Sequence, residues 1–301
     1  MFASLAYYIL IYPISRLPFR VIYALSDGLY YLVFYVIGYR KKVVLQNLRN
    51  SFPEKSSHEI NEIAQKFFRH FCDLMVESFK MFAVTEAELK KRFVFTDIEA
   101  LHQLYKEKRS VILAGGHYNN WEVFAVACQF GLPHKCLALY KPLQNVWFDR
   151  KMRESRSRFG LNMWSIKEAK EMFEQEKNNL SISIFGVDQS PSNPNRCHWM
   201  KFLNQDTGVS YGSEKFAKEL NYPVVYGRIN KVKRGYYSLD IELVTDSPQN
   251  EPHGRILEDV TKRLEADILR QPEFWLWSHK RWKRKKPENV EISVGVETQD
   301  L

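Results

Sequence analysis

Residues 111–122 read VILAGGHYNNWE, and this stretch decides which fold the surrounding sequence can adopt. The β-branched apolar run at its start is typical of a buried strand, and the pair Gly115-Gly116 permits a tight turn. A helix is expected to follow from about Trp121. His117 then lies in the turn and Glu122 in the first helical turn, so the stretch predicts one strand–turn–helix unit of a layered α/β domain.

The spacing of His117 and Glu122 restricts where each must lie. Inside one regular helix, five residues at about 100° each would place them roughly 140° apart, and they would miss each other. They meet only if His117 lies in the turn and Glu122 begins a helix over residues 121–130. Asn119 or Asn120 is a suitable N-cap for that helix. Two interpretations remain at this point: a histidine base whose tautomer Glu122 fixes, and a capped helix start with a polar histidine on a loop.

The rest of the chain repeats the same alternation of strands and helices. Strands are predicted over residues 110–113, 136–139, 181–187, 223–229 and 236–244. Helices are predicted over residues 57–82, 121–130, 144–159, 166–177, 210–220 and 254–270. Ser56 and Glu59 form a capping box for the first of these helices. This order predicts a central, mostly parallel sheet flanked by helices.

The composition is globular, with 45% hydrophobic and 26% charged residues among 301. The four cysteines show neither CxxC nor metal-ligand spacing, so we expect reduced, structural thiols, no metal and no cofactor. The net charge of +9 is uneven, because HKRWKRKK at 279–286 carries six Lys or Arg residues and Arg40-Lys41-Lys42 follows an apolar segment. A basic cluster beside apolar, aromatic sequence favours an anionic membrane surface as partner, and we expect no nucleic acid.

The first forty residues differ from the rest. Residues 1–15 carry no charged side chain, and residues 21–39 carry only Asp27. Pro13 and Pro18 interrupt the apolar runs, so a short anchor, an interfacial helical pair and helices buried against the main domain all remain open. No cleaved signal peptide is expected. We divide the chain into N-terminal membrane-anchor or interfacial helices (1–40), a catalytic domain (41–290) and a disordered tail (291–301).

Three later segments could join His117 in one site, since each follows or borders a predicted strand. They are Tyr140-Lys141-Pro142 with the RSRFG element at 156–160, FGVDQ at 185–189, and PEFWLWSHKRWK at 272–283. Ligands of open α/β sheets gather beyond the carboxyl ends of the strands. Asp188 and His117 are therefore expected on the same rim of the sheet.

Taken together and in this order, these elements resemble the late acyltransferases of lipid A biosynthesis, the lauroyl and myristoyl group, within the wider H-x4-D/E glycerolipid acyltransferases. The resemblance covers most of the chain. Its elements, in order, are Tyr23-Ala24-Leu25, Asn47-Leu48 with Phe52-Pro53-Glu54, GGHYNNWE, Lys141-Pro142, Arg156 with Arg158, Asp188-Gln189 and the PEFWLWSHKRWK motif that ends at Lys283. It implies a glycerolipid acyltransferase-like fold.

The resemblance also implies roles for individual residues. His117 would be the general base and Glu122 its partner. Arg156, with Arg158 as second choice, would stabilise the oxyanion, and Asp188 would be positional. The remaining residues expected to bind substrate are Gln189, Lys141 and Asn120.

The implied reaction is transfer of a fatty acyl chain from a thioester, carried by acyl carrier protein or coenzyme A, to a hydroxyl of a lipid. The expected acceptor is a lipid A precursor, a phosphorylated glycolipid; the alternatives are a lysophospholipid, a glycerol phosphate or an aminolipid. A thioester carbonyl needs only a deprotonated hydroxyl nucleophile and donors for the tetrahedral oxyanion, so we expect direct attack by the acceptor hydroxyl. We expect the inner membrane as location, with the catalytic domain facing the cytoplasm. Two alternatives belong to other classes: a non-catalytic, basic peripheral membrane or nucleic-acid-binding protein that works through HKRWKRKK, and a metal hydrolase using His117, Glu122 and Asp188.

Overall fold

The computed structural model describes residues 2–288 and 290, so the tail predicted over 291–301 lies outside the described residues. Its centre is a seven-stranded sheet in the order β1-β9-β8-β2-β5-β3-β4. The strands are β1 (Phe93–Phe95), β2 (Val111–Gly115), β3 (Lys135–Tyr140), β4 (Asn162–Ser165), β5 (Ser181–Gly186), β8 (Val224–Lys233) and β9 (Tyr236–Thr245). Five neighbouring pairs are parallel and only β8 and β9 run antiparallel, which confirms the predicted α/β class with a mostly parallel sheet.

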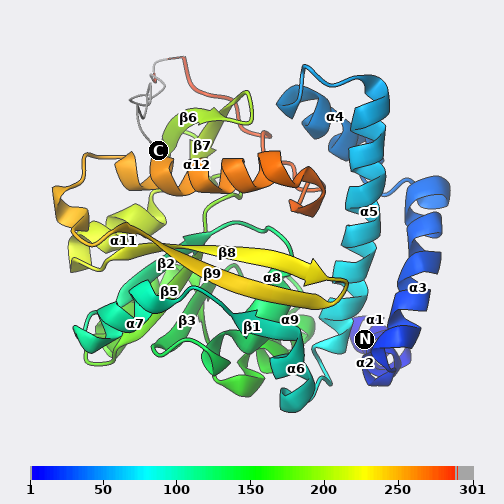
Figure 1. The fold of residues 1–301 in the computed structure, drawn as a ribbon, viewed down its shortest axis with the longest axis horizontal. Coiled ribbons are helices and arrows are strands. Elements are labelled where there is room, and N and C mark those ends of the chain that lie inside the picture. The colour runs from blue at the N-terminus through cyan, green and yellow to red at the C-terminus, as the bar shows by residue number, and fades with distance from the viewer. Residues whose placement is uncertain (1, 289, 291–301) are drawn as a thin grey trace.

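Helices cover both faces of this sheet (Figure 1). Alternate residues of β2 point to opposite sides. Ile112 and Ala114 join a core shared with the helices α5 (Ser57–Lys80), α10 (Ala169–Glu176), α11 (Gly212–Leu220) and α12 (Arg255–Arg270). Val111 and Leu113 join a second core shared with α6 (Glu86–Arg92), α7 (Glu99–Lys106) and α8 (Trp121–Ala127). A strand buried on both faces needs the continuous apolar run that opens VILAGG.

The predicted strands and helices are confirmed within a few residues of their ends, but the helices α4 (Lys41–Ser51), α6 and α7 and several short strands were not predicted. Sequence patterns did not indicate β1, β4, or the separate hairpin of β6 (His198–Phe202) and β7 (Gln205–Val209). These strands have three to five residues, too few for a period of two to stand out. The remaining helical elements are α9 (Val146–Arg156), η3 (Cys128–Phe130), η4 (Ser157–Phe159), η5 (Ile166–Glu168), η6 (Pro248–Asn250) and η7 (Pro272–Phe274).

The long helix α5 is the central helix of the N-terminal half of the chain, and several other N-terminal helices pack against it. The predicted capping box is present, since Ser56 accepts from the amide of Glu59 and Glu59 accepts from the amide of Ser56. Its inner face carries apolar residues, but Asp73 and Glu77 are also buried there. These carboxylates must be hydrogen-bonded to remain in the core.

The N-terminal segment consists of α1 (Phe2–Ala6), η1 (Tyr7–Ile11), α2 (Tyr12–Arg16), α3 (Phe19–Tyr31) and η2 (Leu32–Ile37). Residues Phe19–Ile37 form a continuous helical stretch of 19 residues that is long and apolar enough to cross a membrane. One side of it packs along α5 through Ile22, Ser26 and Tyr30 (Figure 1). Its other side exposes further apolar residues, including Val21, Leu25, Leu32 and Val36.

Candidate active site

His117 lies at the carboxyl rim of the sheet, where the parallel strands β2 and β5 end together. Gly115 of β2 pairs with Gly186 of β5, and the amide of Val187 donates to the Gly115 carbonyl. His117 and Asp188 each follow two residues after that pair. The register therefore brings them side by side, as predicted, although 71 residues separate them in the chain.

Asp188 makes two contacts with His117. Its Oδ1 lies 2.7 Å from the imidazole Nδ1, and its Oδ2 accepts the backbone N–H of His117 at 2.8 Å. The same Oδ2 accepts the indole N–H of Trp275 at 2.9 Å. A carboxylate held by two other donors fixes the imidazole with Nδ1–H towards Asp188 and Nε2 towards the exposed side.

The electrostatics of the pair are those of a buried ion pair. Burial alone would lower the pKa of His117, but the charge and hydrogen bond of Asp188, with a further contribution from Glu122, raise it above 6.5. Burial alone would raise the pKa of Asp188, yet His117 and the N–H donors hold it well below its usual range. Asp188 therefore stays ionised and stabilises the imidazolium that forms when Nε2 takes a proton.

Glu122 was predicted to hydrogen-bond the imidazole of His117, but in the structure Asp188 makes that contact. Glu122 does lie in the first turn of α8, and Asn120 is the N-cap of that helix, accepting from the amide of Val123 at 3.0 Å, both as predicted. However, the Glu122 carboxylate faces α9 and binds Arg156, with 3.0 Å to Nε and 2.6 Å to Nη2. Asp188 is the partner of Nδ1 instead, because the pairing of β2 with β5 brings it within hydrogen-bond distance of the ring.

Arg156 and Arg158 separate on folding. Arg156 is the last residue of α9, and Arg158 lies in the 3-10 turn η4 that follows it, so the two side chains point in different directions. Arg156 lines the cavity beside His117, whereas Arg158 donates to the backbone carbonyls of Met81 and Val84. Arg158 does not line this cavity, and its guanidinium holds the backbone of the Met81–Val84 segment.

Of the other expected site residues, two line the cavity and one does not. Lys141 and Gln189 line the cavity, and the Gln189 side-chain nitrogen lies 3.2 Å from Nε2 of His117. Asn120 is fully buried and does not line the cavity. Its amide group donates to Glu77 instead.

The cavity in front of His117 has a volume of about 810 Å³. Its mouth is polar, with His117, Arg156, Gln189, Lys141 and Asp149. Its walls are apolar and run between the sheet and the helices α8 and α9; they include Leu113, Phe124, Ala138, Leu139, Leu161, Met163, Ile184, Ile229 and Leu239. The space thus suits a ligand with a long hydrocarbon part and a reactive polar end.

Two contacts of the site were not predicted. The motif PEFWLWSHKRWK was expected near the site, but the role of Trp275 as a donor to Asp188 was not. Burial lowers the pKa of His279 to about 4, and its neutral ring accepts the amide of Ser190, which follows Gln189. Across residues 2–288 and 290, no group of three or more His, Cys, Asp or Glu side chains is arranged to hold a metal ion.

A histidine–aspartate pair beside an apolar cavity, on the rim of a parallel sheet, has the form of a general-base site for a ligand with a hydrocarbon part. Residues 1–284 match the profile of the bacterial lipid A biosynthesis acyltransferases, and the chain belongs to that family. It is 24% identical over 286 residues to a lipid A biosynthesis lauroyltransferase of Escherichia coli K12, which covers 92% of this chain and 90% of the relative. It is 22% identical to a lipid A biosynthesis acyltransferase of Haemophilus influenzae, over 91% of this chain and 88% of the relative. A lipid A biosynthesis palmitoleoyltransferase of Escherichia coli K12 is 20% identical, over 90% and 87%.

Proposed function

We propose that this enzyme transfers a fatty acyl chain from acyl carrier protein thioester to a hydroxyl of a lipid A precursor, with His117 as general base. The observation that carries the proposal is the His117–Asp188 pair, whose Nε2 side opens onto the apolar cavity. The family relationship names the class of acceptor, and the cavity suits the acyl chain.

The geometry supports a direct transfer. Nε2 of His117 accepts the proton of the acceptor hydroxyl while that oxygen bonds to the thioester carbonyl carbon. The imidazolium is stabilised by Asp188. Collapse of the tetrahedral intermediate breaks the carbon–sulfur bond, and the imidazolium returns its proton to the leaving thiolate. The Gln189 amide, next to Nε2, occupies the position that we assign to the incoming hydroxyl.

We assign oxyanion stabilisation to Arg156. Glu122 engages its Nε and Nη2 and thereby orients the guanidinium at the wall of the cavity. Nη1 is not part of that pair and is the group that we expect to donate to the developing oxyanion. Glu122 then acts through Arg156 and through its charge near His117, not as the hydrogen-bond partner of the imidazole.

Membrane association is supported by where the cavity opens. The mouth segment 141–149 exposes Leu143 and Val146, and Trp147 of α9 packs edge-on against Tyr7 with 5.3 Å between the ring centroids. The mouth therefore lies beside the N-terminal helices with their exposed apolar residues. We propose that these helices hold the enzyme on the cytoplasmic face of the inner membrane, so that a lipid acceptor enters from the bilayer.

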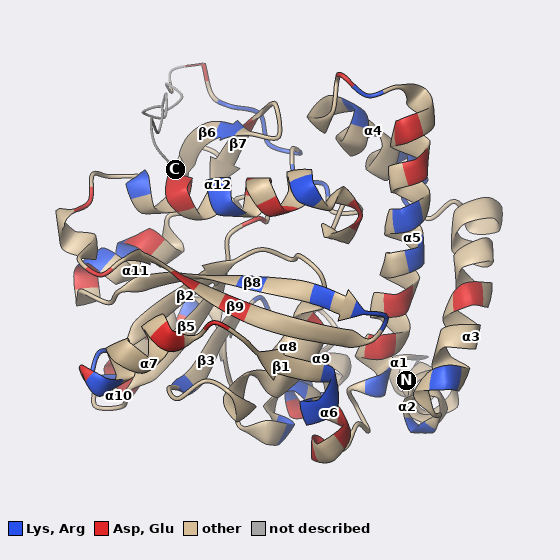
Figure 2. Ribbon diagram, viewed as in Figure 1, with Lys and Arg blue, Asp and Glu red and all other residues tan. Residues whose placement is uncertain are grey.

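The basic surface suits acidic partners. Figure 2 shows Lys and Arg in the segment after α12, between the β6–β7 hairpin and α4. A groove there is lined by Lys42, Lys280 and Lys283 together with Trp282. Such a surface is complementary to anionic lipid headgroups and to an acidic carrier protein.

The test uses purified enzyme with acyl carrier protein thioester or acyl-coenzyme A, each offered a lipid A precursor and lysophosphatidate. Mass spectrometry of the lipid products should show one added acyl chain on the lipid A precursor, with the carrier-protein donor preferred. Acylation of lysophosphatidate without reaction on the lipid A precursor would overturn the proposed acceptor. Retention of the wild-type rate by His117→Ala would overturn the proposed base.

A further inference from the structure

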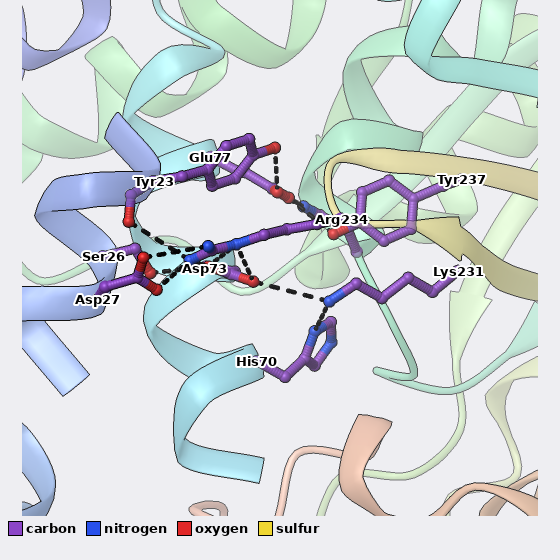
Figure 3. Close-up of polar contacts among 10 residues, drawn as sticks. Tyr23, Ser26, Asp27, His70, Asp73, Glu77, Lys231, Arg234 and Tyr237 are labelled. Atoms are coloured by element: carbon purple, nitrogen blue, oxygen red, sulfur yellow. Dashed lines mark hydrogen bonds and ion pairs between the residues drawn. The ribbon is translucent and has the colours of Figure 1, made fainter. Parts of the chain in front are cut away.

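A partly buried polar cluster joins α3, α5 and the β8–β9 hairpin (Figure 3). Arg234 at the hairpin tip binds both Asp27 of α3 and Asp73 of α5. Lys231 lies 3.7 Å from Asp73 and 3.1 Å from the ring of His70. The charged side chains of the cluster therefore gather around Asp73.

Glu77, one turn further along α5, has a different set of partners. Its Oε1 accepts the hydroxyl of Tyr23 from α3 at 2.8 Å, and its Oε2 accepts the hydroxyl of Tyr237 from β9 at 2.8 Å. Oε2 also accepts the side-chain amide of Asn120. Glu77 is 1% exposed, so its carboxylate depends on these donors for the hydrogen bonds that water would otherwise supply.

Asn120 connects this carboxylate to the active site. Its Nδ2 donates to Glu77, while its Oδ1 accepts the amide of Val123 and so caps α8. It follows His117 by three residues and precedes Glu122 by two. One side chain thus links α5 to the turn that carries the proposed base and to the helix that carries the partner of Arg156.

We propose that Glu77 is a positioning residue through which α3 sets the catalytic turn, by the hydrogen-bond chain Tyr23–Glu77–Asn120. This inference rests on the proposed function for its effect on rate. Its physical basis is that catalytic groups tolerate little displacement, and a buried hydrogen bond to a fixed carboxylate is a stiff restraint. The outer face of α3 is apolar and exposed. Because Tyr23, Glu77 and Asn120 are hydrogen-bonded in series, a shift of α3 against α5 would displace the turn that carries His117.

The chain offers a matched pair of variants. Tyr23 and Ser26 both lie on α3 and both donate at 2.8 Å to a carboxylate of α5, but only the acceptor of Tyr23 contacts Asn120. Tyr23→Phe should lower kcat about tenfold, short of the roughly hundredfold that a 1 Å misplacement can cost. The KM for the donor should stay unchanged. Ser26→Ala should retain kcat, even though it too removes one buried hydrogen bond and lowers the melting temperature.

A double variant tests the chain of contacts. Asn120→Ser keeps an oxygen able to cap α8 but cannot reach Glu77, so Tyr23→Phe in that background should cause no further loss of kcat. Equal losses of kcat in Tyr23→Phe and Ser26→Ala, or losses that add in the double variant, would show a merely structural role and overturn the inference.

Hydrogen exchange separates this inference from the proposed function. Tyr23→Phe should speed exchange at the amides of Val123 and Phe124 in the first turn of α8, whereas Ser26→Ala should not. Unaltered exchange at α8 in Tyr23→Phe would overturn the inference even if the wild type proved active. If instead the wild type acylated no lipid, the proposed function would fail. The exchange comparison would still show whether α3 restrains the first turn of α8.

Discussion

Replacing Asp188 by asparagine should inactivate the enzyme without emptying the space that the carboxylate occupies. In the wild type, Oδ2 accepts two N–H donors, from the backbone of His117 and the indole of Trp275, at 2.8 and 2.9 Å. An asparagine must point its carbonyl oxygen at these donors. Its NH₂ group then takes the Oδ1 position, 2.7 Å from Nδ1 of His117. Nδ1 must accept a hydrogen bond there, so the ring proton moves to Nε2, and the base can no longer accept a proton.

The expected loss follows from this change of tautomer. Rates should fall roughly 10³- to 10⁴-fold, or about 4–5.5 kcal/mol of transition-state stabilisation, as in serine hydrolases whose triad aspartate is replaced by asparagine. The pH dependence should change as well. The wild-type base must be neutral, so kcat/KM rises with pH through a pKa of His117 that lies above 6.5. Loss of the Asp188 charge lowers that pKa, and the rising limb of the residual activity should move to lower pH.

The assay is the initial rate of acyl transfer to a lipid A precursor across pH, with thermal melting to confirm folding. Asp149→Asn is the matched control, because Asp149 also lines the cavity but hydrogen-bonds Tyr140 and the amide of Leu143. It should stay within about tenfold of the wild type, as expected for a group outside the proton transfer. A similar result for Asp188→Asn, with an unmoved pH limb, would refute the assignment of Asp188 as the residue that orients the base.

Three further outcomes are expected. Arg156→Lys should lower kcat about 10²-fold, because lysine cannot keep the forked contact to Glu122 and still reach the oxyanion. Adding Glu122→Gln to that variant should lower kcat little further, and fully additive losses of kcat would contradict the pairing of Arg156 with Glu122. Gly186→Ala places a Cβ 3.0 Å from Cε1 of His117, so kcat should fall about tenfold as the ring shifts, while an unchanged kcat would show that the ring has room to move. Val36→Asp, at a side chain that is 75% exposed on η2, should weaken sedimentation with anionic vesicles roughly tenfold or more while activity on a detergent-dispersed acceptor remains; equal sedimentation would argue against membrane contact by this face.

Local features of the site could be predicted from sequence. The strand β2, the glycine turn, the Asn120 cap and the position of Glu122 in the first turn of α8 all depend on residues a few positions apart. The capping box of α5 depends on Ser56 and Glu59 alone. The alternation of apolar strands and amphipathic helices likewise predicted the parallel sheet, because a strand buried on both faces needs a continuous apolar run.

Contacts between distant segments could not be predicted from the spacing of residues. The chain places Glu122 five residues from His117 and Asp188 71 residues away, yet Asp188 holds the imidazole. The reason is that the pairing of β2 with β5 sets which side chains meet at the rim, and that register is a property of the packed sheet. Glu122 faces α9 because helix packing turns it towards Arg156.

The sequence by itself therefore determined the layered α/β fold, the turn that carries His117, and the rim on which Asp188 would join it, since these follow from local propensity and periodicity. Only the tertiary structure decided that Asp188 binds the imidazole, that Glu122 binds Arg156, that Arg158 faces away, and that Glu77 ties α3 to the cap of α8. Each of those contacts joins segments brought together by burial of apolar surface, and the direction of a side chain across such an interface is fixed only once both sides are packed.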